Sequence, residues 1–167
     1  MLTFIIYDSS FGNTARVAQA IGRGAATLGD VTVLSADEAG GRAQRANLLF
    51  VGGPTQLHHL SPGLRAFLEA LPRGSLQRVP AASFDTRYRM TAFLTGSAAK
   101  EAAGRLRRAG CQLIAPPESF FMEKDVPPKG ERRRHALEGL EKGELERAEE
   151  WGRSVASAAF RGRAVKE

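Results

Sequence analysis

Apolar runs of strand length alternate along this chain with segments in which apolar residues recur at helical spacing. The first run, 2–7, is β-branched, aromatic and too continuously apolar to leave one face in water, which predicts a central strand of a sheet. The apolar segment 90–94 is not assigned to either kind of element. The predicted strands are 2–7, 31–36, 47–52, 80–85 and 112–115, the last of which resumes through Phe120 and Phe121.

The segments between these strands predict helices that each bury one apolar stripe. Ser61 and Pro62 form a helix-start pair, with a side-chain cap and a preset φ at the first helical position. Ser97 opens a further helix, and Gly29 and Gly110 are natural helix stops. The residues predicted to face inward are Ala18, Ile21, Ala25 and Leu28; Leu64, Phe67, Leu68 and Leu71; Ala99, Ala102, Ala103 and Leu106; and Leu145, Ala148, Val155 and Ala159, with Trp151 packed in the core nearby.

Five strands that alternate with helices predict a doubly wound α/β fold, in which helices cover both faces of a five-stranded parallel sheet in three layers, α/β/α. A chain of 167 residues with 43% hydrophobic residues is sufficient for one core of ordinary size. We therefore expect a single domain over 1–167, with a charged insertion at about 124–143 before the last helix.

Ligands bind to such sheets at the carboxyl ends of the strands, where the strand order reverses. In one of the two common strand orders, the loops after the first, third and fourth strands meet at that point. These loops are "SSFGNT" at 9–14, "GPTQLHHLS" at 53–61 and "DTRYR" at 85–89. The site is therefore expected at their junction.

The first of these loops has the composition of an anion site. A strand that turns tightly into a helix leaves backbone N–H groups at the positive end of the helix dipole, and Gly12 lets the backbone come close to a ligand. The side chains that can donate to phosphate oxygens are Ser9, Ser10, Asn13 and Thr14. The loop has no lysine, which excludes a Walker-type nucleotide loop. A capped helix start without a ligand is the alternative interpretation.

The motifs "IIYDSSFGNT", "LLFVGGPT", "SFDTR", "GSAAKEAAGRLRRAG" and "GELERAEEWG" run through most of the chain. Together they resemble the flavodoxin-like family of FMN-binding proteins. The resemblance implies that the first loop binds the FMN phosphate and that the other two loops contact the isoalloxazine ring. The implied cofactor-binding residues are Ser9, Ser10, Phe11, Gly12, Asn13, Thr14, Pro54, Thr55, Gln56, Leu57, His58, Asp85, Thr86, Arg87 and Tyr88. Asp85, at a strand end, is alternatively a cap of its own loop rather than an acid or base.

The function implied by the resemblance is electron transfer, in which FMN carries the chemistry and a redox partner protein exchanges electrons with it. One alternative is an FMN-dependent NAD(P)H:quinone-type oxidoreductase, so whether the chain is an enzyme stays open. Another is a flavodoxin-fold binding protein with little flavin affinity. Phe11 stands where many flavodoxins have a hydroxyl residue, and "PTQLHHL" lacks the tryptophan that often covers the flavin.

Basic residues outnumber acidic residues, 24 to 18, which gives a formal net charge of +6. The densest cluster, 132–134, lies among glutamates, which favours a mixed-charge surface segment over a nucleic-acid site. Arg87 and Arg89 place positive charge in the third loop, which would favour the anionic reduced flavin and an acidic redox partner. Ordinary surface arginines are the alternative.

Other features of the sequence bear on the cellular compartment and on metal binding. No apolar run approaches the ~20 residues that cross a bilayer, and "MLTFIIYD" has no basic leader, which predicts a cytoplasmic protein without a membrane segment. The single cysteine, Cys111, is expected to be a buried apolar residue in a reducing compartment. His58 and His59 are adjacent and point in different directions, and with only His135 elsewhere no metal site is expected. The oligomeric state is not predicted.

Overall fold

The computed structural model describes residues 1–56, 59–89, 96–123 and 139–164. The predicted segment 90–94 and most of the predicted insertion lie outside these residues. The elements in chain order are β1 (Thr3–Tyr7), α1 (Asn13–Ala25), η1 (Ala26–Leu28), β2 (Val31–Ser35), α2 (Ala36–Ala39), η2 (Gly40–Arg45), β3 (Leu48–Gln56), β4 (His59–Leu60), α3 (Pro62–Ala70), β5 (Pro80–Tyr88), α5 (Ala98–Ala109), β6 (Gln112–Leu113), β7 (Glu118–Met122) and α6 (Glu144–Ala164).

The sheet has the strand order β2-β1-β3-β5-β6, and all of these neighbours pair in parallel. The strand β7 also pairs with β5 in parallel, further along the same edge, so β6 and β7 share one edge position. Pro116 and Pro117 lie between them and have no N–H groups to continue the ladder. The predicted fifth strand therefore exists as two segments. The short strand β4 adds an antiparallel pairing to the end of β3.

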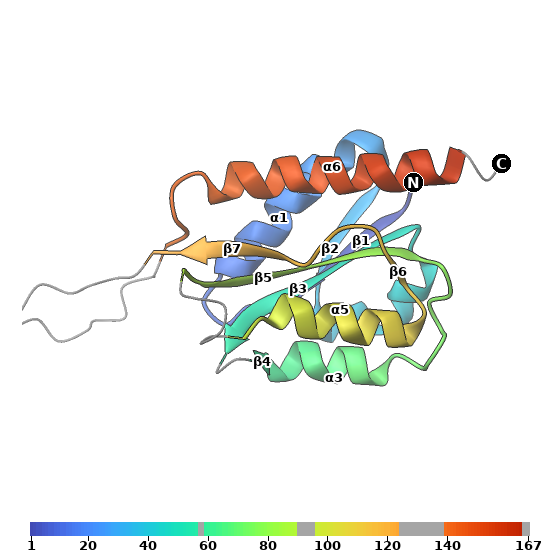
Figure 1. Ribbon diagram of the computed structural model, residues 1–167, viewed down its shortest axis with the longest axis horizontal. Helices are drawn as coiled ribbons and strands as arrows, with labels where there is room; N and C mark the ends of the chain where they lie inside the picture. Colours follow the sequence, from blue (N-terminus) through green and yellow to red (C-terminus); the bar gives the residue numbers. More distant parts are fainter. Residues whose placement is uncertain (57–58, 90–95, 124–138, 165–167) are drawn as a thin grey trace, which may run out of the picture.

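Helices α1 and α6 cover one face of the sheet, and α3 and α5 cover the other (Figure 1). Successive side chains of a strand point to opposite faces. In β1, Phe4 and Ile6 accordingly pack in the core beneath α3 and α5, while Ile5 packs beneath α1 and α6. The predicted doubly wound α/β architecture with three layers is confirmed.

Trp151 of α6 lies in the core, as predicted. Its ring meets the rings of Phe50, Phe84 and Phe120 edge-on, with centroids 5.4, 6.4 and 6.0 Å away. Such aromatic pairs contribute about 0.5–1.5 kcal/mol each beyond the area that they bury. This cluster fixes α6 against β3, β5 and β7.

Glycines bring α1 and α6 into direct backbone contact. A Cβ at Gly24 would overlap the carbonyl oxygen of Glu149, and a Cβ at Gly152 would overlap that of Ile21. The two helices therefore approach more closely than side chains would allow at these positions. The layer on this face of the sheet consequently joins the first and last helices of the chain.

Two local predictions are corrected. Ala36 begins α2 instead of ending the second strand, because Ser35 and Glu38 form a capping box that starts a helix there. Pro62 is the first residue of α3, as expected, but Ser61 makes no side-chain cap hydrogen bond. In the described part of the chain, no helix is both long and apolar enough to cross a membrane.

Candidate functional site

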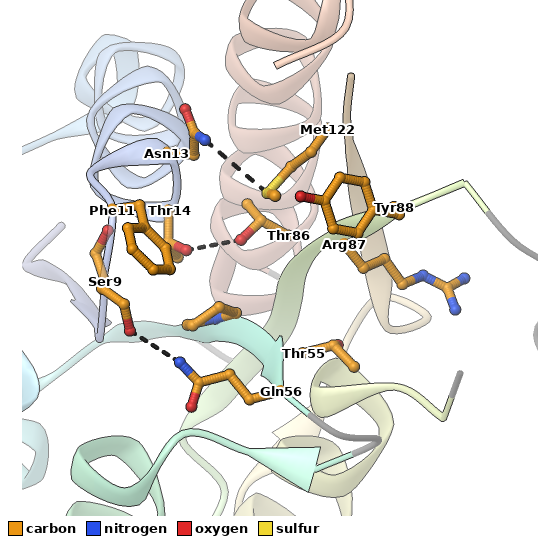
Figure 2. Close-up of a pocket in the computed structure, with 12 residues that line it drawn as sticks. Ser9, Phe11, Asn13, Thr14, Thr55, Gln56, Thr86, Arg87, Tyr88 and Met122 are labelled. Atoms are coloured by element: carbon orange, nitrogen blue, oxygen red, sulfur yellow. Dashed lines mark hydrogen bonds between the residues drawn. The ribbon is translucent and has the colours of Figure 1, made fainter. Parts of the chain in front are cut away.

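The three predicted loops meet at the carboxyl edge of the sheet, but 53–56 and 85–88 are the last residues of β3 and β5 and not loop. Tyr7, Gly52 and Phe84 are neighbours in the register of β1, β3 and β5, so these strands reach the edge together. A pocket of about 180 Å³ lies at this junction (Figure 2). It is lined by Ser9, Ser10, Phe11, Asn13, Thr14, Pro54, Thr55, Gln56, Thr86, Arg87, Tyr88 and Met122.

The turn into α1 forms one wall of the pocket. Gly12 is the N-cap and has a φ of 87°, a left-handed conformation that glycine adopts without strain. Ser9 Oγ accepts hydrogen bonds from the N–H groups of Gly12 and Ala15, at 3.1 and 3.4 Å, and its own hydrogen remains available to a ligand. The first turn of α1 has no acidic residue, so no carboxylate there offsets the positive end of the helix dipole.

A hydrogen bond between two side chains joins the first and second loops. Gln56 Nε2 donates to Ser10 Oγ at 2.8 Å, across the mouth of the pocket. Pro54 and Thr55 complete this wall, and β4 turns the loop back because Leu60 pairs with Thr55. The predicted site residues Leu57 and His58 lie outside the described residues.

The floor of the pocket lies between α1, β5 and β7. Thr14 Oγ1 and Thr86 Oγ1 are 2.7 Å apart and buried, so they share a hydrogen bond. Asn13 Nδ2 reaches Met122 Sδ at 3.9 Å, and the Tyr88 ring lies beside Met122 (Figure 2). The sequence analysis missed Met122. Only the register of β7 on β5 could have indicated Met122, because Met122 pairs with Tyr88 where β7 continues past Phe121.

Asp85 lies beneath the pocket and does not line it. Its side chain is completely buried, and Oδ2 accepts hydrogen bonds from Thr55 Oγ1 (3.0 Å), Ser97 Oγ (2.7 Å) and the Ala99 N–H (3.0 Å). One carboxylate thus ties the end of β3 to the start of α5. Oδ1 lies 3.8 Å from Arg87 Nε. Asp85 positions the second and third loops, and its alternative interpretation as a loop cap describes this geometry.

The arginines of the third loop are held by carboxylates. Arg87 pairs with Asp85, donates to the Gly96 carbonyl oxygen at 3.1 Å, and extends its guanidinium away from Thr14 and Met122 (Figure 2). Arg89 pairs with Glu141 at 2.8 Å, and this hydrogen bond is the main reason that the pKa of Glu141 is lowered. The structure therefore places no uncompensated charge from these two arginines at the pocket.

Other predicted residues lie outside the pocket. Gly12 belongs to the same turn but does not line it. His59 is exposed, and its Nδ1 lies 3.7 Å from Glu101 Oε2. Cys111 is buried, and burial raises the pKa of its thiol to about 11. Among the described residues, no three histidine, cysteine, aspartate or glutamate side chains cluster as metal ligands would.

No protein-family model matches this sequence, and no curated protein sequence matches it. Solved structures do. A flavodoxin from the domain Archaea superimposes with a TM-score of 0.72 at 20% identity, over 96% of this chain and 99% of that one. A Streptococcus pneumoniae flavodoxin gives a TM-score of 0.73 at 17% identity, over 94% and 99%. The flavodiiron protein from Giardia intestinalis gives 0.72 at 18% identity, over 96% of this chain but 36% of that chain.

The strand order, the helices on both faces and the pocket at the carboxyl edge define a doubly wound α/β protein. Among the doubly wound α/β folds, the similar structures show that the chain has the flavodoxin-like fold, as its sequence motifs indicated.

Proposed function

We propose that the pocket at the carboxyl edge binds FMN and that the 9–14 loop holds its phosphate. The observation that carries this proposal is the turn into α1, where a left-handed glycine cap and neutral donor side chains surround a helix start without a carboxylate. An anion at this position is favoured by the helix dipole and by the backbone N–H groups at the helix start. FMN ends in a phosphate, and this anionic group matches the donors of the turn into α1.

The remaining walls fit a flat aromatic ring. Pro54, Tyr88 and Met122 supply apolar surface, while Thr55, Gln56 and Thr86 supply hydrogen-bonding groups. The volume of about 180 Å³ is below the roughly 300–1,000 Å³ of pockets that enclose a whole ligand. The described walls therefore surround part of the cofactor and leave the rest toward solvent.

FMN, when bound, supplies one-electron and two-electron chemistry. The chain binds and orients it, and Asp85 holds the second and third loops in place behind it. We propose electron transfer to or from a partner protein as the function, which is supported by the flavodoxins among the similar structures. An acidic partner stays a prediction. Steady oxidation of NAD(P)H by the FMN-loaded protein would instead support the oxidoreductase alternative.

Titration with FMN and with riboflavin, followed by quenching of flavin fluorescence, tests the proposal. Riboflavin has the same ring without the phosphate, so it loses the charge-assisted hydrogen bonds of the 9–14 loop. We expect its dissociation constant to be at least about tenfold higher than that of FMN. Equal constants would remove the assignment of the phosphate to this loop. Failure of both flavins to bind would support a flavodoxin-fold binding protein with little flavin affinity.

A further inference from the structure

A second pocket, of about 240 Å³, lies between the C-terminal ends of α3 and α5. These helices run antiparallel to the strands, so their ends lie at the amino edge of the sheet, opposite the candidate flavin site (Figure 1). We call this the arginine pocket. Its lining residues are Leu68, Glu69, Leu71, Arg73, Arg105, Arg108 and Ala109.

Arg105 is held in place from two sides. Its guanidinium donates to Glu69 Oε1 at 3.0 Å and to Glu101 Oε1 at 3.3 and 3.0 Å. A guanidinium has five N–H groups, and these hydrogen bonds use three of them. The side chain is therefore pre-oriented and still has donors for a ligand, which lowers the entropy that binding would cost.

Arg73 and Arg108 have no hydrogen-bond or ion-pair partner for their side chains within the described part of the chain, and both are exposed. Their backbones are nevertheless fixed side by side. The Gly74 N–H meets the Arg108 carbonyl oxygen at 3.4 Å, and the Leu76 N–H meets the Ala109 carbonyl oxygen at 2.8 Å. Two uncommitted guanidinium groups thus border one cavity.

The charges of the arginine pocket do not cancel. Glu69 and Glu101 both pair with Arg105, which leaves the charges of Arg73 and Arg108 without a carboxylate partner among the described residues. Leu68, Leu71 and Ala109 supply the apolar part of the lining. Favourable interaction with the C-terminal dipole of α5 would explain a basic last turn, but it applies equally to Arg107, which does not line the cavity. Arg73 follows the C-terminal end of α3, whose dipole also favours a cation, but the dipoles alone do not require cations from two helix ends to border the same cavity.

We propose that the arginine pocket binds a small oxyanion that carries at least two negative charges, either a phosphate ester or a polycarboxylate. Guanidinium groups match both chemistries with paired N–H donors. The apolar part of the lining gives space for a short hydrocarbon part of the ligand. This site is separate from the candidate flavin site and does not depend on flavin binding.

The test is a titration of the full chain with pyrophosphate and, separately, with citrate at constant ionic strength. Binding is followed by ¹⁵N NMR of the arginine Nε–H groups and of the backbone amides. Arg73→Gln/Arg108→Gln removes the two uncommitted cations. Arg78→Gln/Arg107→Gln is the matched control, because it removes two exposed arginines near the same edge that do not line the cavity.

We expect saturable shifts of the Nε–H signals of the lining arginines with at least one of the two anions. The dissociation constant should rise roughly tenfold or more in Arg73→Gln/Arg108→Gln and less than about twofold in the control. A response to citrate alone or to pyrophosphate alone identifies the ligand class. Three outcomes would overturn the proposal: no saturable shift, equal weakening in both variants, or shifts confined to the amides of Asn13 and Thr14, which line the other pocket.

Discussion

The two edges of the sheet differ in how many of their arginines pair with a carboxylate, although Arg105 at the amino edge is paired. At the carboxyl edge, Arg87, Arg89 and Arg147 each pair with a carboxylate, and Arg147 also donates to the carbonyl oxygen of Ser119. At the amino edge, exposed arginines have no ion-pair partner among the described residues. This second group comprises Arg73, Arg78, Arg107 and Arg108.

The difference shows that net charge says little about the charge at a site. The sequence has a formal net charge of +6, yet the pocket at the carboxyl edge is lined mostly by neutral polar and apolar side chains. Its nearby arginines act as structural links between β5, β7 and α6. At the amino edge the arginines are free to meet a ligand from solution. We therefore expect substitutions at the carboxyl edge to affect stability and flavin binding, and substitutions of the exposed arginines at the amino edge to affect stability little.

The largest effect is expected from Asp85→Asn. The substitution removes a buried charge that accepts three hydrogen bonds and pairs with Arg87. We expect the free energy of unfolding to fall by about 3 kcal/mol, because three donors lose the buried carboxylate that they share. Urea denaturation at neutral pH measures the change, with Arg107→Gln as the control within about 0.5 kcal/mol. A loss below about 1 kcal/mol would contradict the structural role of Asp85.

The next largest effect concerns the flavin. Thr14→Ala removes a buried hydroxyl from the pocket and should weaken FMN binding by about 1–3 kcal/mol, as for hydrogen bonds to charged groups. Ser10→Ala should have a smaller effect, because Ser10 is exposed and water can take the place of its hydroxyl. Thr27→Ala, beyond the far end of α1, is the matched control. An unchanged FMN dissociation constant in Thr14→Ala would remove Thr14 from the phosphate site.

A smaller, pH-dependent effect is expected from Glu101, which binds the Leu60 N–H and Arg105 beside the second loop. Burial alone would raise its pKa, but these hydrogen bonds and Arg65 outweigh burial and lower it. Because the folded-state pKa is below the unfolded value, Glu101 stabilises the protein above about pH 4.5, and this contribution disappears as the pH falls through the lower, folded-state pKa.

The comparison of Glu101→Gln with wild type in urea, from neutral pH down to about pH 3, measures this effect. The difference in unfolding free energy should shrink on acidification. Glu150→Gln is the control, since Glu150 is exposed and has no ion-pair partner among the described residues. A difference that stays constant with pH would show that the Glu101 carboxylate is not responsible.

The smallest effect is expected at the amino edge. Arg107→Gln removes an exposed, unpaired charge, so the free energy of unfolding should change by no more than about 0.5 kcal/mol. Any gain at low salt should vanish at about 0.5 M NaCl, because repulsion between exposed charges is screened. Denaturation at both salt concentrations measures this. Destabilisation by more than about 1 kcal/mol would reveal an interaction that the comparison of the two edges omits.

The main strands and helices could be predicted from the sequence because each depends on a local pattern of apolar residues or on a helix-stop glycine. The apolar run 2–7 could only be a buried strand, and the helix stops at Gly29 and Gly110 have positive φ values. The meeting of the three loops also followed from topology. Of the predicted site residues, those that the structure describes lie in or directly behind one pocket.

The missed features depend on partners that are distant in sequence. Met122 reaches the pocket only because β7 pairs with β5 in one register. The charge of Arg89 is offset by Glu141, 52 positions away, and no local pattern indicates that pair. The resemblance implied that Asp85 contacts the ligand, but its hydrogen bonds to Thr55 and Ser97 turn it away from the pocket.

The close backbone contacts of Gly24 and Gly152 between α1 and α6 also bear on the order in which the molecule assembles. The helix α1 is synthesised well before its partner α6, with the strands β1–β7 and the helices α3 and α5 ahead of α6 in the chain. One face of the sheet, including Phe50 and Phe84, is therefore not fully covered until α6 has been synthesised. Contacts between such distant segments form slowly, because the loop between them must close first. In pulsed hydrogen exchange during refolding, α6 should gain protection after α3 and α5.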